Sequence, residues 1–327
     1  MKNQVIRLLS KDFVGLFLAL LLLIIFFGLK SDYFWSALTL TTIANQVPAL
    51  LVIAVGMTFV LIVAGIDLSV GSVMAFCGAV LGVAIVDMQM GLWLGALVCI
   101  AAGLLCGLFN GIVVTRWGVP SFIVTLGMLE IARGGAYLVT DSQTRYIGSA
   151  VEGISAPLPV IGLAPSVIAA LLIVAAAQLL LSKTVFGRYA VAVGSNEEAV
   201  HLSGINVAAI KLAVFALAGA LAGLGGLFHV GYLQSADPNA GIGLELSAIA
   251  AVVIGGTSLS GGKGSVVNTL LGVLIITVLQ TGLAQIGASE PGKRVVTGVV
   301  IIAAVIIDVY RNRSGSVGGY LRSVMSR

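Results

Sequence analysis

Long hydrophobic stretches alternate with short polar connections along most of the chain, and this pattern predicts membrane-spanning helices. A helix needs about 20 mostly apolar residues to cross a bilayer. Roughly ten stretches approach this length, over residues 13–29, 45–64, 68–86, 91–115, 121–139, 164–182, 211–230, 245–257, 266–286 and 293–310. We therefore expect an all-α polytopic membrane protein with about ten transmembrane helices, some of them short or broken.

Two of these stretches depart from a simple crossing helix. The segment around 64–90 carries glycines that permit a broken or re-entrant helix, namely Gly65, Gly71, Gly78 and Gly82. The stretch 245–257 is too short to cross alone at about 1.5 Å per residue. We expect it to need flanking residues, or not to cross fully.

Composition supports a membrane protein, because 59% of the residues are hydrophobic and only 9% are charged, far below the quarter or so of a soluble domain. The net charge is +4, but the basic residues lie singly between hydrophobic stretches, which fits membrane orientation and not nucleic-acid binding. Most Lys and Arg residues fall on one side when the N-terminus is placed in the cytoplasm. We expect both termini to be cytoplasmic and the first stretch, 13–29, to be a retained helix and not a cleaved signal.

The domain organisation predicted from this pattern is simple. Residues 1–310 form one transmembrane domain, and residues 311–327 form a basic cytoplasmic tail. Residues 140–163 lie outside as an ordered loop or short helix, and residues 183–210 lie inside as the longest polar segment between crossings. No stretch offers a separate soluble domain.

The inner segment contains a short predicted helix. Asn196 or Ser195 can cap its start, Glu197 and Glu198 suit the positive end of its dipole, and the helix stops at Gly204. A helix that stands off a membrane bundle can dock into a groove on a partner. A solvated connector is the plain alternative, and these residues alone leave both open.

A more specific signal comes from the spacing G-R-x-x-x-A-x-G-x-N-x-x-A-x-x-x-x-G-I, which begins at Gly187 and ends at Ile205. It resembles the cytoplasmic coupling segment of bacterial ABC-transporter permeases of the ribose type. The stretches "VGMTFVLIVAGIDLSVGSVMA" (55–75), "GVPSFIVTLGMLEIARG" (118–134) and "ELSAIAAVVIGGTSLSGGKGSVVNTLLG" (245–272) resemble the same family. Together the similarity runs from about residue 45 to residue 310.

The resemblance implies the membrane subunit of a monosaccharide importer in the bacterial inner membrane. It implies three partners: a second permease, identical or related, a cytoplasmic ABC ATPase, and a periplasmic or extracytoplasmic sugar-binding protein. Nothing in the sequence names the sugar or chooses between a homodimer and a heterodimer. The residues implied to couple to the ATPase are Gly187, Arg188, Gly194, Asn196, Glu197, Glu198, Ala199, Ser203 and Gly204.

The sequence contains no motif that is typical of a nucleotide-binding site, a metal site or a hydrolase. Gly261-Gly262-Lys263 is followed by Gly264 and lacks the spacing and hydroxyl of a phosphate-binding loop, so we interpret it as a tight turn between helices. ATP and Mg²⁺ are then bound by the partner ATPase. His201 and His229 are isolated and support no metal site, and no hydrolase motif occurs. We expect no cofactor in this chain and no enzyme activity.

Asp67 is a lone carboxylate between two apolar runs. A charge at the bilayer centre costs about 2.5–3.5 kcal/mol on insertion scales, so it is expected to face the bundle or a cavity. Asp67 or Ser69 can cap free N–H groups at the start of the next helix. We favour capping over contact with a solute.

Three further polar residues lie inside predicted helices. Glu130 and Arg133 are three apart on one helical face, where they can neutralise each other, or one of them can line the pathway near its outer mouth. Asn110 is expected to bridge helices and not to bind sugar.

Two other functions compete with an ABC permease. A secondary transporter driven by an ion gradient would use Asp67, Glu130 and Arg133 as a relay, and the short eighth helix is typical of such designs. A receptor-like or structural membrane protein would stay monomeric and bind no ATPase. The absence of detectable inverted repeats and the polar segment 183–210 favour the ABC permease.

Overall fold

The computed structural model describes residues 11–159 and 162–306 of the chain. The described part is almost entirely helical, and its only sheet pairs the two-residue strands β1 (Arg145–Tyr146) and β2 (Ser235–Ala236) antiparallel. The labelled helices in chain order are α2 (Lys11–Lys30), α3 (Ala37–Ile62), α4 (Val70–Val86), α5 (Leu92–Trp117), α6 (Ser121–Thr140), η1 (Gly148–Val151), α7 (Glu152–Ser155), α8 (Pro165–Lys183), α9 (Val185–Ser195), α10 (Glu197–Leu202), α11 (Val207–Leu233), α12 (Leu244–Ile254) and α13 (Val266–Gln285). A further helix covers residues 290–306.

These helices confirm the predicted all-α membrane fold. Seven helices of the described part are long and apolar enough to cross a membrane, and α4 and α12 are shorter apolar helices. Helix α4 lies in the glycine-containing segment for which we expect a broken or re-entrant helix, and α12 lies in the stretch that is too short to cross alone. The tenth predicted span, 293–310, starts in the helix over 290–306 and continues outside the described residues, where the predicted tail 311–327 also lies.

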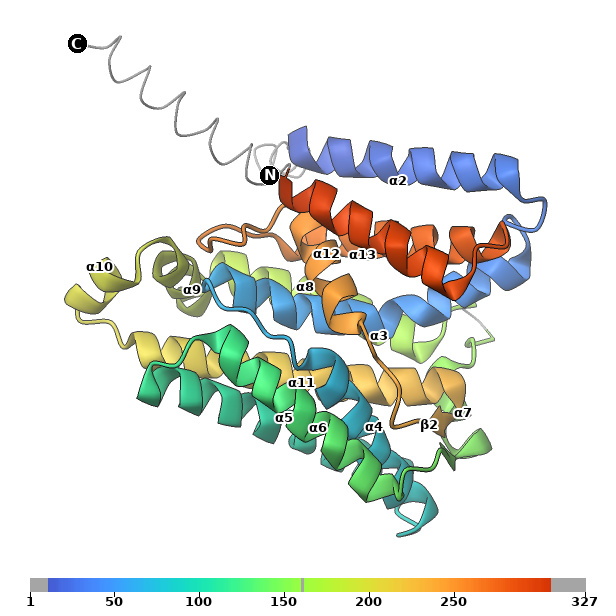
Figure 1. Cartoon of the computed structure of the whole chain (residues 1–327), viewed down its shortest axis with the longest axis horizontal. Coiled ribbons are helices and arrows are strands. Elements are labelled where there is room, and N and C mark those ends of the chain that lie inside the picture. The colour runs from blue at the N-terminus through green and yellow to red at the C-terminus, as the bar shows by residue number, and fades with distance from the viewer. Residues whose placement is uncertain (1–10, 160–161, 307–327) are drawn as a thin grey trace.

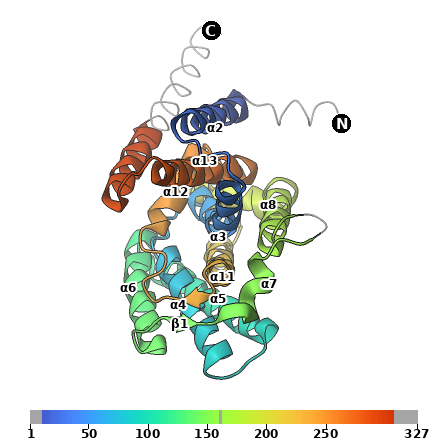
Figure 2. The same cartoon turned by 90° about the vertical axis from the view of Figure 1, so that its right-hand side faces the viewer.

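Helix α3 is the axis around which the others pack. Its residues 47–62 are all buried, although they are as apolar as those of a lipid-facing helix. Figure 2 shows α3 near the middle of the bundle, with α13, α8 and α11 around it. A helix that is hydrophobic on every side is expected at such a position, because no face of it needs water.

Glycine allows α5 and α11 to pack with their backbones in contact. A Cβ atom on Gly103 would lie 2.8 Å from the backbone nitrogen of Gly223, and one on Gly219 would lie 2.7 Å from the Cα of Gly107. The thiol of Cys99 extends this contact by donating to the carbonyl of Gly223 over 3.2 Å. Small residues at four-residue spacing give this close approach in membrane helices generally.

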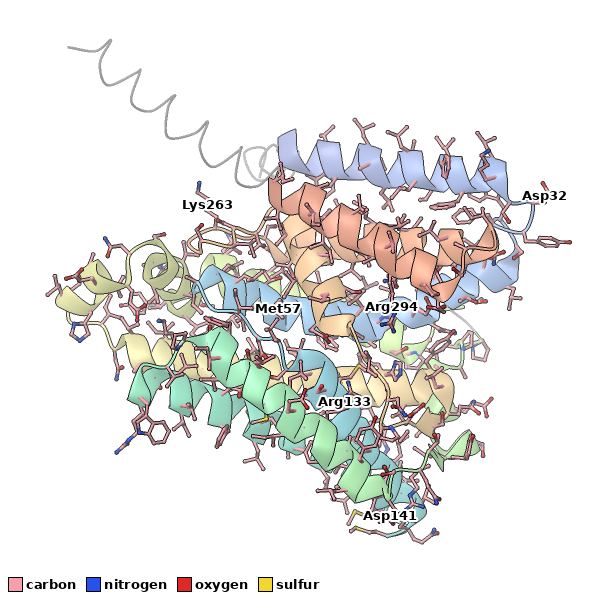
Figure 3. The ribbon with its side chains drawn as sticks, in the orientation of Figure 1. Asp32, Met57, Arg133, Asp141, Lys263 and Arg294 are labelled. Carbon is pink, nitrogen blue, oxygen red and sulfur yellow. The ribbon has the colours of Figure 1, made fainter. Side chains whose placement is uncertain are left out.

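The two ends of the bundle differ in what they carry (Figure 1). One end, which we call the α10 end, holds α9, α10 and the turn between α12 and α13. The opposite end, which we call the β end, holds β1, β2 and α7. Figure 3 shows Lys263 at the α10 end and Asp32 and Asp141 at the β end.

The Gly261-Gly262-Lys263 run forms the turn that the sequence predicts. Gly261 and Gly262 have φ angles of +82° and +73°, which favour glycine over residues with a side chain. The backbone nitrogen of Ser258 donates to the carbonyl of Lys263 over 3.1 Å, which closes the turn before α13 begins.

Candidate functional site

The helix predicted at the α10 end is present with the predicted cap. The side-chain oxygen of Asn196 accepts a hydrogen bond from the backbone nitrogen of Ala199 over 3.0 Å, and Glu197 and Glu198 occupy the first turn. Gly204 follows the helix with a φ of +79°. Glu197 also pairs with Lys211 of α11 over 2.6 Å, which ties α10 to the next long helix.

The residues that the resemblance implies for coupling divide into two groups. Gly187 is buried, and Gly194 packs closely against other parts of the backbone. The other seven are exposed on α9, on α10 or beside them, and these are Arg188, Asn196, Glu197, Glu198, Ala199, Ser203 and Gly204. The structure therefore separates residues that anchor the segment from residues that a partner could touch.

The anchor is a contact of three backbones, which we call the Gly194 junction and which comprises Ile62, Gly194, Gly261 and Gly262. A Cβ atom on Gly194 would overlap the carbonyl of Ile62, the last residue of α3. The same carbonyl accepts a hydrogen bond from the nitrogen of Gly262 over 2.9 Å. Helix α9, the end of α3 and the turn before α13 thus meet without side chains between them.

Side chains from α8 and α9 reinforce this junction. The ring of Phe186 packs on Phe59 of α3 with a centroid distance of 6.3 Å. The side-chain oxygen of Gln178 accepts hydrogen bonds from Val266 and Val267 over 2.9 and 3.2 Å, and so caps the first turn of α13. Sequence reasoning did not identify α9 as a helix, although Thr184 caps its start by accepting from the nitrogen of Gly187 over 3.2 Å.

The segment between α3 and α4 is irregular, partly buried and held by polar side chains. Asp67 is 2% exposed, and its Oδ1 accepts from both the backbone nitrogen and the hydroxyl of Ser69, over 2.9 and 2.6 Å. Asn110 of α5 donates to the hydroxyl of Ser69 over 3.2 Å. Ser69 is the N-cap residue of α4, but its side chain accepts no hydrogen bond from the helix, and Asp67 accepts only from Ser69, so neither side chain caps the first turn of α4 as expected. The contacts fit a structural role, since Asp67 orders the residue before α4 and Asn110 bridges to it from another helix. The functional roles of the three residues stay predictions.

Helix α6 holds the same segment from the other side. Ser121 accepts from the backbone nitrogen of Ile66 over 2.9 Å, and Thr125 accepts from that of Leu68 over 3.0 Å. Non-helical backbone inside a membrane needs such partners because no water is available there. Side chains of α6 thus supply hydrogen-bond acceptors for backbone N–H groups of this irregular segment.

Glu130 and Arg133 form no ion pair, although their charges still interact, so their mutual neutralisation and a place on the pathway both stay predictions. The Nη1 atom of Arg133 donates to the carbonyls of Pro238 and Ala240 over 2.5 and 2.8 Å instead. The irregular segment before α12 leaves these carbonyls without helical partners, and they offer the guanidinium two acceptors. The hydroxyl of Tyr137 adds a bond to Asn239 over 2.6 Å, so α6 fixes this segment at the β end.

A cavity of about 660 Å³ lies toward the β end, bounded by α3, α11, the start of α12, α13 and the helix over 290–306. Its polar lining residues are Thr42, Asn45, Gln46, His229, Tyr232, Ser247, Thr277, Gln280, Thr281, Gln285, Glu290, Lys293, Arg294 and Thr297. Four of these carry carboxamides, which donate and accept hydrogen bonds without carrying charge. Glu290 and Lys293 form an ion pair with each other.

Sequence reasoning missed this cavity. Its lining residues are spread from position 42 to position 301, and only the packing of several helices brings them together. The sequence does contain a signal for it. Gln46 and Gln280 are polar residues within predicted spans, and they are as unusual in a membrane as Asn110 is. Within residues 11–159 and 162–306, no group of three metal-ligating side chains is found.

Comparison with known proteins gives consistent results. Residues 39–305 match the family model described as branched-chain amino acid transport system / permease component. The chain is similar to the ribose import permease of Escherichia coli K12, with 41% identity over 298 residues, covering 89% of this chain and 92% of that protein.

Further relatives match over similar lengths. The ribose import permease of Bacillus subtilis is 38% identical over 308 residues, covering 90% of this chain and 92% of that protein. The fructose import permease of Rhizobium meliloti is 34% identical over 307 residues, covering 90% of this chain and 84% of that protein. No solved structure matches the chain.

Proposed function

Because the chain belongs to this family of transport permease components, which are not enzymes, we propose that it is the membrane permease of an ABC importer. It moves a monosaccharide into the cytoplasm, and a separate subunit hydrolyses the ATP. The observation that carries the proposal is the Gly194 junction. It joins a surface segment at the α10 end to α3 and to the turn before α13, the helices that line the cavity at the other end.

The ATPase docks on the exposed residues of α9 and α10. Arg188, Glu198 and Ser203 face outward there, where a partner can reach them. The cap at Asn196 and the ion pair between Glu197 and Lys211 keep α10 in one position. A push on this short helix is therefore passed to the bundle and not lost in a loose loop.

The names of the relatives favour a neutral sugar over a branched-chain amino acid as the solute. The relatives are named for ribose and fructose, whereas the family description names branched-chain amino acids. A sugar needs donors and acceptors around its whole ring, which the carboxamides and hydroxyls of the lining supply. Among the sugars, the relatives most favour ribose.

The remaining partners follow from the family. A second permease subunit, identical or related, completes the pathway, and an extracytoplasmic sugar-binding protein docks on the loops of the β end, over 140–163 and 231–244. The chain lies in the bacterial inner membrane with both termini in the cytoplasm. Magnesium and ATP bind to the ATPase and not to this chain.

The contacts of the charged side chains argue against a secondary transporter. Asp67 is engaged by Ser69, and Arg133 by two carbonyls, so Asp67, Glu130 and Arg133 form no relay of hydrogen bonds among the described residues. An ion-coupled carrier needs its titratable groups within reach of one another or of a shared ion.

The test is ATP hydrolysis by the assembled transporter in proteoliposomes, with ribose and its binding protein present. Deleting residues 197–203 is expected to abolish stimulated hydrolysis while membrane insertion is kept. A charge reversal on the docking surface, Glu198→Arg, is expected to lower it strongly. Arg116→Glu is the control, because Arg116 is an exposed charge at the same end of the bundle, outside α9 and α10. Unchanged hydrolysis after the deletion, or uptake by the permease alone, would contradict the proposal.

A further inference from the structure

Glu130 is placed where a charge is least expected. It is the tenth of the 20 residues of α6, a helix long and apolar enough to cross a membrane. At about 1.5 Å per residue, each end of the helix is roughly 14 Å away. The carboxylate is therefore close to the bilayer centre, and its side chain is exposed on the surface of the chain.

This carboxylate forms no ion pair and no hydrogen bond in the described part of the chain, although the charge of Arg133 acts on it without direct contact. None of the four ion pairs and none of the hydrogen bonds found there includes Glu130. The nearest cation along the helix, Arg133, directs its Nη1 atom to the carbonyls of Pro238 and Ala240. Charged side chains inside membranes normally face the protein interior or a water-filled cavity, because a bare carboxylate in hydrocarbon is costly.

The direction of Glu130 on α6 identifies the surface it faces. Met128, with Val124 and Ala132, lies on the buried side of the helix. Glu130 follows Met128 by two residues, about 200° around the helix, and so points away from that side. Tyr137, two turns further on, shares this direction, and its hydroxyl bonds to Asn239. Glu130 thus faces the side that the segment before α12 crosses.

This side of the bundle also carries the cavity. The segment that Tyr137 and Arg133 hold continues into Gly241, Gly243 and Leu244, which line the cavity wall. Figure 1 shows α6, α12 and the last described helix on one face, and Figure 3 shows Arg133 and Arg294 on that same face. A Cβ atom on Gly127 or Gly134, on either side of Glu130 along the helix, would meet nothing within 4 Å. The surface around the carboxylate is thus not filled by this chain.

We propose that Glu130 lies in water on the wall of the solute pathway, below the cavity, and accepts hydrogen bonds from the hydroxyl groups of a neutral polyol as it passes. The second permease subunit forms the opposite wall, and in this respect the inference rests on the proposed function. It explains how an exposed carboxylate is tolerated in the middle of an apolar helix. It also places the middle of the pathway on α6, at a residue that the cavity does not include.

The first test is the accessibility of an engineered cysteine in the assembled transporter, embedded in membrane vesicles and treated with a charged, impermeant methanethiosulfonate reagent. The cysteine thiolate attacks such a reagent, which forms a mixed disulfide and releases methanesulfinate, and the thiolate forms in water and not in lipid. Glu130→Cys is expected to react at least about tenfold faster than Leu105→Cys. Leu105 is the matched control, since it lies in the middle of α5 and is 65% exposed. The parent protein, with its three native cysteines, gives the background rate.

An equally slow reaction of both cysteines, with Asn239→Cys reacting readily, would overturn the proposal. The reaction needs neither ATP hydrolysis nor transport. Fast labelling without ATP-driven uptake would therefore leave the pathway position standing and refute the proposed function. ATP-driven uptake together with slow labelling of Glu130→Cys would support the proposed function and refute the pathway position.

The second test compares two substitutions of Glu130. Glu130→Gln keeps a hydrogen-bond acceptor and is expected to stay within about threefold of the parent uptake rate, whereas Glu130→Leu is expected to lower it about tenfold. The amount of each variant in the membrane should match the parent, because leucine is at least as well tolerated there as glutamate. If Glu130 faced lipid, Glu130→Leu would transport as the parent does, and this result would overturn the proposal.

Discussion

The Gly194 junction and the cavity are built in opposite ways, although the same helices take part in both. At the junction, backbone meets backbone, and the space is too small for a single Cβ atom on Gly194. At the cavity, long polar side chains surround about 660 Å³ of free space. Close packing leaves no free volume between the elements, so elements in such contact move together. Open space lets side chains rearrange around a solute.

The distance between the two regions explains why both are needed. Ile62 at the junction and Gln46 in the cavity wall lie on the same helix, α3, and are separated by sixteen residues, or roughly 24 Å. Helix α13 makes a second connection, from Val266 beside Gln178 to Gln280 in the cavity. Two helices joined at one end can carry a displacement from the docking surface to the solute. We infer that the close backbone contact at the junction transmits motion from the docking surface, and that the free space of the cavity lets its walls move around the solute.

The largest effect is expected from Gly194→Val, which breaks the junction directly. The new side chain overlaps the carbonyl of Ile62, so α9 has to separate from α3. Overpacking of this kind costs about 1–3 kcal/mol of unfolding free energy, or more where backbone is displaced. We expect ATP-driven uptake to fall by at least about 100-fold, measured with labelled sugar in proteoliposomes.

A valine at another glycine separates the junction from a general effect of the substitution. Gly15→Val in α2 is suitable because a Cβ atom there meets nothing within 4 Å. It should leave both uptake and thermal unfolding close to the parent values. Normal uptake by Gly194→Val would show that the junction does not transmit motion.

The second effect concerns Asp67, on the segment that follows the junction. Asp67→Ala leaves the backbone nitrogen and hydroxyl of Ser69 without their acceptor in a buried place. We expect a loss of about 1–3 kcal/mol in unfolding free energy, seen as a lower melting temperature in detergent. Asp67→Asn keeps an acceptor and should lose less. A normal melting temperature with uptake selectively lost in both variants would instead move Asp67 to the solute pathway.

The third effect concerns the cavity, where we expect more tolerance. Gln280→Ala removes one hydrogen-bonding group from the wall and leaves the packing of α13 intact. The loss of one hydrogen bond to the sugar, about 1 kcal/mol, predicts a KM for uptake raised about fivefold. ATP hydrolysis stimulated by the binding protein should not change. A collapse of hydrolysis would mean that the cavity is as tightly coupled as the junction.

The smallest effect is expected from Lys211→Ala, which removes the ion pair with Glu197. More than half of the Glu197 side chain is exposed, at 55%, so solvent screens the pair. We expect less than about 0.5 kcal/mol in stability and a change in uptake too small to separate from the parent. A large loss would show that side-chain contacts of α10, and not the backbone junction, carry the coupling.

The sequence predicted the elements whose signals are local. The cap at Asn196 and the stop at Gly204 depend on residues within one short segment, and the structure confirms both. The same holds for the short helix α12, whose length is visible in the hydrophobic pattern. Local chemistry decides such features, so neighbours along the chain are enough to find them.

Features that depend on tertiary packing could not be predicted from the sequence. Gln46 and Gln280 are far apart in the sequence, and only the packing of α3 against α13 brings them to one cavity. Helical spacing places Arg133 and Glu130 on one face, which predicts either a contact between them or a place for one of them on the pathway. The carbonyls of Pro238 and Ala240, from another part of the chain, are better acceptors at the observed positions. A helix pattern cannot show what a distant irregular segment offers.

The central claim is that α9 and the turn before α13 move as one body, so the most direct measurement joins them covalently. Ser195→Cys and Lys263→Cys place two thiols on either side of the contact between Ser195 and Gly262, where a short bismaleimide can bridge them. If the junction moves as a unit, the cross-linked transporter keeps its ATP-driven uptake. If cross-linking stops uptake while ATP hydrolysis continues, the two elements must separate during transport, and the account is contradicted.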